Sequence, residues 1–130
     1  MDKIDKEILK LLKANSQLTN KEIGKQVHLT GQAVGQRIMK LKEDGTIAAF
    51  STTINYPNQQ FIMIYMDSND FKNFENFITK SPQIDEFYKI SGHACYLIKS
   101  HFASPELGDF LENLSIWGRY NVETVIKNLI

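Results

Sequence analysis

The stretch Val27–Ile47, VHLTGQAVGQRIMKLKEDGTI, decides how the N-terminal part of the chain folds. Its apolar residues recur at helical spacing, and the break at HLT separates the end of one helix from the start of a longer one. Thr30 is placed to cap the longer helix, and Gly45 is placed to end it. The residues of this helix that we expect to face the core are Val34, Ile38 and Leu41. The stretch therefore predicts two helices joined by a tight turn.

Another helix is expected at the start of the chain, where apolar residues recur at helical spacing behind Asp2, which can cap it. This helix is predicted to end near residues 14–18. Thr19 and Glu22 form a capping-box pattern at the head of the helix NKEIGKQV. After the third helix, TIAAFSTTINY (46–56) is predicted to form one or two strands. Three helices followed by a β-ribbon are the organisation of a winged helix-turn-helix.

The outward side of the third helix carries few large side chains. If the buried stripe faces inward, a step of about 100° per residue gives an outward side that we also expect Arg37 to share. Its residues are Gln32, Gly35, Gln36, Met39, Lys40 and Glu43. Glutamine can pair with adenine in the major groove, and small residues allow close approach to DNA. Each glycine makes a helix less stable by roughly 1 kcal/mol relative to alanine. A need for close approach to DNA would explain why two glycines are present in this helix. Ordinary packing of three helices, with Gly and Gln tolerated on a solvated face, is the alternative that stays open.

Charge is divided between the two halves of the chain, although the total is zero. Residues 1–50 carry 9 Lys/Arg and 6 Asp/Glu, a net of +3, whereas residues 51–130 carry 6 and 9, a net of −3. The N-terminal half is therefore the better candidate for contacting a polyanion such as double-stranded DNA. Lys21, Lys25 and Lys40 are predicted to contact its phosphates.

The single cysteine, Cys95, excludes an intramolecular disulfide and is typical of a reducing compartment. The first residues are charged and amphipathic, unlike a signal peptide. The longest apolar run, FIMIYM, is far too short to span a bilayer. We therefore expect a cytoplasmic protein without a membrane partner.

The second half of the chain alternates strand and helix patterns. A helix is expected in DFKNFENFITK (70–80), and a second in SPELGDFLENL (104–114), with Ser104 as its cap and Pro105 at its first position. The expected strands are FIMIYM (61–66), IDEFYKI (84–90), CYLIKS (95–100) and NVETVIKNLI (121–130). This βαββαβ order is that of a ferredoxin-like module.

The chain as a whole is thus predicted to be an α+β protein. Its parts are a winged helix-turn-helix over residues 1–50, a strand linker over 51–60 and a ferredoxin-like domain over 61–130. FIMIYM is apolar at every position, so both faces of the sheet need cover, and two helices can cover only one. A second copy of the chain is the economical cover, which predicts a homodimer or a larger homo-oligomer.

The sequence resembles the Lrp/AsnC family of transcriptional regulators over nearly its whole length. The matching features are an opening "ID..IL..L..N..L", a "T..E.G..V.L" second helix, a "V..R...L...G.I" third helix and, in the second half, SGHACYLI. The resemblance implies promoter binding, dimers paired through C-terminal sheets, and a small effector, commonly an amino acid. The recognition-helix positions that it implies are Thr30, Gly31, Gln32, Gln36 and Arg37.

The resemblance also places an effector site at the turn between the second and third strands of the C-terminal domain. The residues it implies there and in the last strand are Gly92, His93, Ala94, Cys95, Tyr96 and Thr124. The family typically has acidic residues where this chain has His93 and Cys95, and a second threonine near Ile126. A carboxylate would suit the ammonium group of an amino acid, so this chain is expected to bind a different ligand or none.

Other chemistry finds little support in the sequence. His93, Cys95 and His101 share an even spacing, but no fourth metal ligand lies near them. No phosphate-binding loop, nucleophile elbow or catalytic triad is evident, so we expect no enzyme, no metal and no cofactor. Two alternatives to a regulator stay open: a helical domain that docks on proteins within a sensor or assembly protein, and a small ferredoxin-like enzyme.

Overall fold

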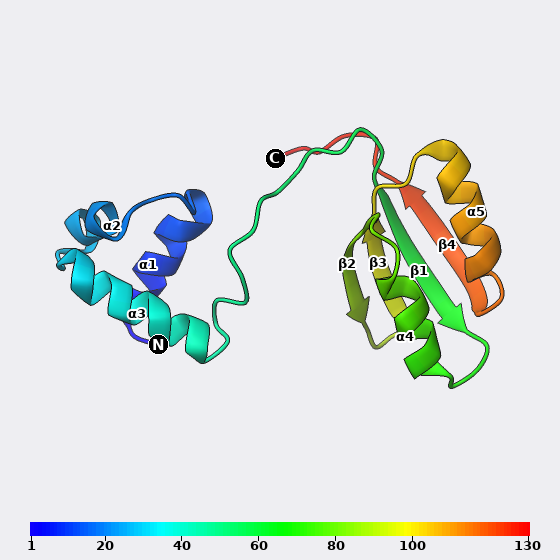
Figure 1. Cartoon of the computed structure of the whole chain (residues 1–130), viewed down its shortest axis with the longest axis horizontal. Coiled ribbons are helices and arrows are strands. Elements are labelled where there is room, and N and C mark those ends of the chain that lie inside the picture. The colour runs from blue at the N-terminus through cyan, green and yellow to red at the C-terminus, as the bar shows by residue number, and fades with distance from the viewer. The chain divides into compact units, whose positions relative to one another are not determined.

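Three helices form the first of the two units into which the chain divides. A computed structural model describes all residues, 1–130, and separates Met1–Thr53 from Ile54–Ile130 (Figure 1). The boundary falls inside the predicted linker. The helices of the first unit are α1 (Lys3–Ala14), α2 (Asn20–Val27) and α3 (Gly31–Glu43), as their spacing predicts.

Side-chain caps fix where these helices begin. Thr19 Oγ1 accepts a hydrogen bond from the Glu22 backbone N–H at 3.1 Å, and Glu22 Oε1 accepts one from the Thr19 N–H at 2.9 Å. This reciprocal capping box confirms the prediction for α2. Asp2 caps α1, and Thr30 Oγ1 accepts from the Ala33 N–H at 3.1 Å to cap α3.

The core of the first unit lies where the three helices meet. Its fully buried residues are Ile8, Ile23 and Val34, one from each helix. The predicted inward stripe of α3 is confirmed at Val34 and Leu41, whereas Ile38 is half-buried at the edge of the core.

The strands predicted within residues 46–56 are wrong for the single chain. No residue from Ala48 to Tyr56 lies in a strand, and the side chains of Phe50 and Ile54 are about half exposed. The segment has the alternating pattern of a strand, but a strand forms only where another strand supplies hydrogen bonds. Within this chain no strand pairs with it, so neither the ribbon of a wing nor a strand linker is present.

The second unit has the predicted βαββαβ order. Its elements are β1 (Gln60–Met66), α4 (Phe71–Thr79), β2 (Ile84–Lys89), β3 (Tyr96–Ser100), α5 (Ser104–Leu114) and β4 (Gly118–Thr124). The strands form one antiparallel sheet in the order β2-β3-β1-β4, which Figure 1 shows from one side to the other. This topology confirms the ferredoxin-like expectation.

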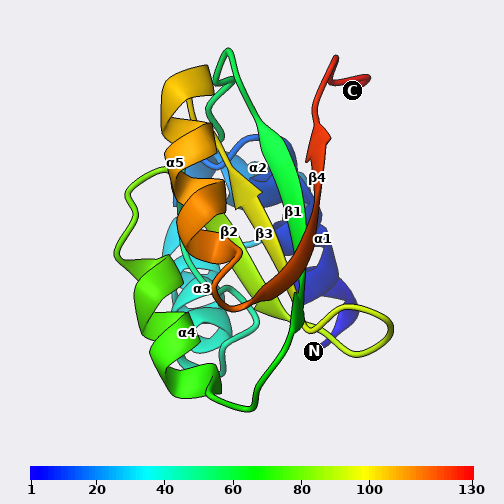
Figure 2. The same cartoon turned by 90° about the vertical axis from the view of Figure 1, so that its right-hand side faces the viewer.

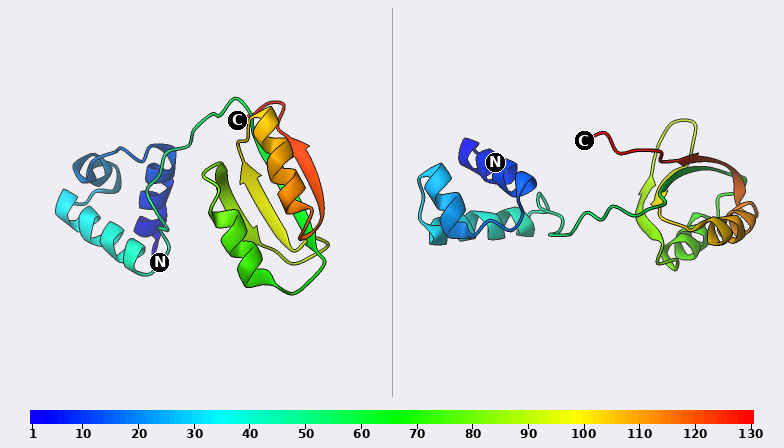
Figure 3. Two further views of the ribbon diagram at one scale, coloured as in Figure 1. Left: turned by 45° about the vertical axis from the view of Figure 1, so that its right-hand side comes forward. Right: turned by 90° about the horizontal axis from the view of Figure 1, so that it is seen from above.

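Both helices of this unit cover the same face of the sheet (Figures 2 and 3). Ile62 and Ile64 of β1 point to this covered face and are fully buried, together with Phe74 of α4 and Leu114 of α5. On the opposite face, which we call the open face, Phe61 is 40% exposed. The apolar pattern of β1 therefore has cover on one side only.

Most bounds in the second unit lie within one residue of the sequence prediction, and the larger differences concern α5 and the last strand. The cap of α5 is Ala103 rather than Ser104, which is already helical, so Pro105 stands second in the helix. The last strand begins at Gly118, three residues before the predicted start at Asn121, and ends at Thr124, six residues before the predicted end at Ile130. Its end follows from register, because Thr124 pairs with Gln60, where β1 begins. Beyond this pair one backbone hydrogen bond follows, from the Val125 N–H to the Gln59 carbonyl at 2.9 Å.

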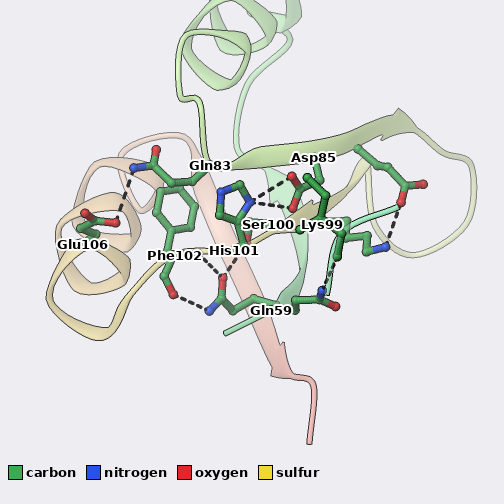
Figure 4. Close-up of polar contacts among 11 residues, drawn as sticks. Gln59, Gln83, Asp85, Lys99, Ser100, His101, Phe102 and Glu106 are labelled. Carbon is green, nitrogen blue, oxygen red and sulfur yellow. Dashed lines mark hydrogen bonds and ion pairs between the residues drawn. The ribbon is translucent and has the colours of Figure 1, made fainter. Parts of the chain in front are cut away.

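A buried polar network fixes that end of the sheet. Gln60 is 2% exposed; its Nε2 donates to the Phe102 carbonyl at 2.9 Å, and its Oε1 accepts from the Phe102 N–H at 3.0 Å and from Ser100 Oγ at 2.8 Å. Figure 4 labels Ser100 and Phe102 in this network. Both the nitrogen and the oxygen of this buried amide therefore have hydrogen-bond partners. None of the helices combines the length and apolarity that a membrane crossing requires.

Candidate nucleic-acid interface and effector residues

The side chains predicted to contact DNA lie on the solvent side of α2 and α3. Gln32, Gln36 and Lys40 are exposed along α3, and Lys21 and Lys25 are exposed on α2. Two glutamine amides and three ammonium groups thus point away from the core. They present hydrogen-bonding groups suited to base edges and positive charges suited to phosphates.

The glycines of α3 have a packing cause that the sequence did not reveal. A Cβ on Gly31 would lie 3.3 Å from the Lys21 backbone nitrogen, and one on Gly35 would lie 3.0 Å from Asn20 Nδ2. The start of α3 therefore runs close against the start of α2, with little room for side chains between them. Close helix packing explains the bare start of α3 without reference to a groove.

The turn between α2 and α3 depends on Gly24, the glycine of the second-helix motif, to which the sequence analysis gave no role. Gly24 is buried, and a Cβ there would stand 2.3 Å from the Leu29 carbonyl oxygen. His28 ends α2 in the left-handed conformation, with φ of 61°, and its N–H donates to the Gly24 carbonyl. The signal available in the sequence was a glycine inside a helix just before a helix-turn-helix break.

Arg37 has intramolecular partners that the sequence did not predict. Its Nη1 lies 2.7 Å from Asp2 Oδ2, 2.9 Å from Asp2 Oδ1 and 3.1 Å from Asp5 Oδ1. The hydrogen bond from Arg37 lowers the pKa of Asp2 below its usual range, helped by the hydrogen bond from the Asp5 N–H. The same carboxylates raise the pKa of the Arg37 guanidinium. Arg37 therefore ties α3 to the N-terminus of α1.

The predicted effector residues do not form one site within a single chain. Gly92 and His93 are exposed in the turn, Ala94 is buried, and Cys95 is half-buried, its N–H donating to the Ile64 carbonyl at 2.8 Å. Thr124 lies at the other end of the sheet, opposite Gln60 rather than Ile64. Four residues along β1 separate these positions, a distance of about 13 Å.

Tyr96 belongs to the core of the second unit rather than to an open turn. Its side chain is 1% exposed and packs on Phe74, with ring centroids 4.9 Å apart. Its hydroxyl donates to the Glu75 carboxylate. Burial, followed by this hydrogen bond, raises the pKa of the Tyr96 phenol well above its usual value.

A hollow of about 720 Å³ does lie beside His93. It is lined by Tyr65 and Asp67 at the end of β1 and by Arg119 and Asn121 of β4, among others. The Arg119 guanidinium stands 5.4 Å from the centroid of the Tyr65 ring, and Asn121 Nδ2 donates to the Tyr65 hydroxyl at 3.2 Å. A carboxylate and a guanidinium thus face one open space.

His101, weighed above with His93 and Cys95, has a different neighbourhood. Its Nδ1 lies 2.8 Å from Asp85 Oδ2, and its ring stacks on Tyr56 with the centroids 3.7 Å apart. Figure 4 shows the imidazole turned toward the Asp85 carboxylate. No three His, Cys, Asp or Glu side chains gather in a way that could hold a metal ion.

Comparison with known proteins assigns both units. Residues 1–48 match the family model for winged helix-turn-helix DNA-binding domains, and residues 59–127 match that of the Lrp/AsnC ligand binding domain. The chain is 36% identical to the HTH-type transcriptional regulator LrpB of Bacillus subtilis, over 99% of this chain and 91% of that protein. It is 37% identical to LrpA of the same organism, over 97% and 98%.

Solved structures agree with the fold. The structure of Bacillus subtilis LrpC superimposes with a TM-score of 0.87 at 25% identity, covering 100% of this chain and 97% of that one. The Neisseria meningitidis regulator NMB0573, solved as a complex with L-Met, gives a TM-score of 0.85 at 23% identity, covering 100% and 92%.

Proposed function

The chain belongs to the Lrp/AsnC family of DNA-binding transcriptional regulators, and on that basis we propose that it acts as a homodimer or larger homo-oligomer whose binding to promoters responds to a small effector. Its relatives are named transcriptional regulators, and we propose a non-catalytic role in the cytoplasm. The observation that carries the proposal is the exposed row of Gln32, Gln36 and Lys40 on the third helix of a helix-turn-helix.

In this proposal the two glutamines read base edges in the major groove. Thr30 and Gly31 form the N-terminus of α3, where backbone N–H groups and the helix dipole favour a phosphate. Lys21, Lys25 and Lys40 add phosphate contacts, which make the affinity depend on salt. Two copies related by a twofold axis would place two such helices on a partly palindromic operator.

The open face of the sheet is the proposed dimer surface. Met63 and Leu97 pair across β1 and β3 on this face, between Phe61 and the half-exposed Tyr88. Neither helix of the second unit covers these side chains, and a contiguous apolar patch of this kind marks an association site. A Met63→Asp variant should therefore shift the protein toward monomers in sedimentation, while Lys72→Asp on the exposed side of α4 should not.

The hollow beside His93 is the proposed effector site. The sequence led us to expect a ligand other than an amino acid, or none, because the turn at His93 lacks a carboxylate. The hollow contains Asp67, which suits an ammonium group, and Arg119, which suits a carboxylate, so an amino acid is proposed instead. The structural neighbour solved with L-Met supports this ligand class. Thermal unfolding in the presence of each amino acid tests it: a stabilising one should lose its effect in Asp67→Asn and in Arg119→Gln, and no effect with any amino acid would overturn it.

The DNA proposal is tested by selecting duplexes from a random pool with the full-length protein and sequencing the bound fraction. A partly palindromic motif should be enriched. Gln32→Ala and Gln36→Ala should each lower affinity for that motif by about 1–3 kcal/mol and relax specificity. Gln17→Ala, an exposed glutamine before α2, is the matched control and should bind like the parent. Failure to enrich any motif, with the protein folded, would favour a protein-docking role.

A further inference from the structure

We propose that Arg37 is a positioning residue, which sets the presentation of α3 by holding it to the N-terminus of α1 through Asp2 and Asp5. The family resemblance implied that Arg37 is one of the recognition-helix positions, whereas in the structure its guanidinium contacts Asp2 and Asp5. The inference rests on the proposed DNA-contacting face of α3, because it concerns how that face is held.

The geometry gathers three carboxylate oxygens around one nitrogen of Arg37. Nη1 contacts both oxygens of Asp2 and one of Asp5, at 2.7 to 3.1 Å. The side chain of Arg37 is 31% exposed and that of Asp5 only 18%, so solvent screens the Asp5 contact less than an ordinary surface pair. These bonds join residues 35 and 32 positions apart.

The two carboxylates are already fixed by the backbone of α1. Asp2 Oδ1 accepts from the Asp5 N–H at 2.8 Å, and Asp5 Oδ2 accepts from the Asp2 N–H at 3.4 Å. An ion pair gains little where two mobile side chains must be ordered, but here the capping box has ordered one partner. The clamp therefore connects α3 to a helix end anchored in the core by Ile8.

The clamp lies beside the residues proposed to contact DNA. A hollow of about 520 Å³ is lined by Gln36 and Lys40 as well as by Arg37 and the two aspartates. The carboxylates of Asp2 and Asp5 would repel a phosphate that approached Arg37, and their removal would make that approach easier. Direct contact and positioning by Arg37 therefore predict opposite results when the aspartate charges are removed.

The test compares three variants of the full-length protein on the selected duplex at several salt concentrations: Asp2→Asn/Asp5→Asn, Arg37→Ala and the triple variant. Asparagine is as good a helix cap as aspartate, so the cap survives. Positioning predicts that each variant weakens DNA binding about tenfold, that the triple variant is no weaker than Arg37→Ala, and that the dependence on salt keeps its slope.

Direct contact predicts the reverse pattern. Removing two negative charges would tighten binding, and Arg37→Ala would reduce the salt slope by about 1. Either of these results overturns the proposal. Glu7→Gln is the matched control, since it removes an exposed carboxylate from α1 that has no such partner. A parent protein that binds no duplex would instead refute the proposed function.

A charge-reversed pair guards against variants that merely fail to fold. Arg37→Asp alone should abolish specific binding. Combining it with Asp5→Arg should restore binding in part, because the guanidinium, now on α1, again faces two carboxylates, that of Asp2 and the one introduced on α3. A direct DNA contact by Arg37 would not be rescued in this way, and absence of rescue in a folded double variant counts against the clamp. Circular dichroism establishes that each variant is folded at the assay temperature.

Discussion

Replacing Gly24 by alanine should destabilise the helix-turn-helix unit specifically. The added Cβ would stand 2.3 Å from the Leu29 carbonyl oxygen and 3.3 Å from its carbon. Both atoms belong to the backbone, so no side-chain rotation relieves the contact. The backbone between α2 and α3 would have to move.

The size of the effect follows from that movement. A carbon and an oxygen approach to somewhat over 3 Å, so the turn must retreat by about 1 Å. Overpacking of this kind costs about 1–3 kcal/mol. The shift also weakens the hydrogen bond from the Leu29 N–H to the Gly24 carbonyl, now 3.0 Å, which is worth about 1 kcal/mol. Better helix propensity of alanine returns about 1 kcal/mol, leaving a net loss of about 2 kcal/mol.

The distribution of chromophores allows each unit to be followed separately. Trp117 and all five tyrosines lie in the second unit, Ile54–Ile130, so tryptophan fluorescence reports on that unit, while far-UV circular dichroism also reports on the helices of the first. Gly24→Ala should lower the unfolding temperature of the first unit, followed by far-UV circular dichroism, by about 10 °C. The unfolding of the second unit, followed by Trp117 fluorescence, should not change.

The matched control is Gly108→Ala in α5. Nothing lies within 4 Å of a Cβ added there, so helix propensity alone acts and the second unit should gain up to about 1 kcal/mol. The two variants make the same chemical change in two helices and should move different transitions in opposite directions. If the first unit of the Gly24→Ala protein unfolds at the same temperature as that of the parent, the reasoning is refuted.

Three further outcomes are expected. Gln60→Leu leaves the polar groups of Phe102 without partners in the interior and should cost about 3 kcal/mol in the second unit, measured by Trp117 fluorescence in urea. His28 has a left-handed backbone, with φ of 61°, which glycine adopts without strain. His28→Gly should therefore stabilise the first unit by about 0.5 kcal/mol and raise its unfolding temperature in circular dichroism. The hydrogen bonds with Thr19 lower the pKa of Glu22. Their contribution to stability is therefore present above the pKa of about 4.3 in the unfolded chain and is lost as the pH falls. Glu22→Gln should make the unfolding temperature of the first unit depend less on acidic pH.

Features that depend on neighbours in sequence were predictable. Helix bounds in the first unit followed from Asp2, Thr19 and Thr30, because a cap acts within three residues of itself. The βαββαβ order followed from a change of hydrophobic period along the chain. The two-sided apolar pattern of β1 likewise indicated an open face of the sheet.

Features that depend on residues far away in the sequence could not be predicted. The segment before Tyr56 has the pattern of a strand but no strand to pair with in this chain. The last strand ends at Thr124 because its partner strand β1 begins at Gln60. Nothing in the sequence near Thr124 indicates this limit. The glycines of α3 were interpreted from what an outward face could contact, although Gly31 and Gly35 lie against α2.

Arg37 shows how far helical geometry alone could have gone. It stands three residues after Val34 and four before Leu41, both buried, so it borders the inward stripe rather than lying opposite it. Gln32, Gln36 and Lys40 are exposed, whereas Arg37 is half-buried. A charged side chain at the border of a core can reach groups of opposite charge on a neighbouring helix, as Arg37 reaches Asp2 and Asp5 on or next to α1. The family pattern marks Arg37 as part of the recognition helix, and the border position explains why an arginine there can serve the helix without contacting DNA.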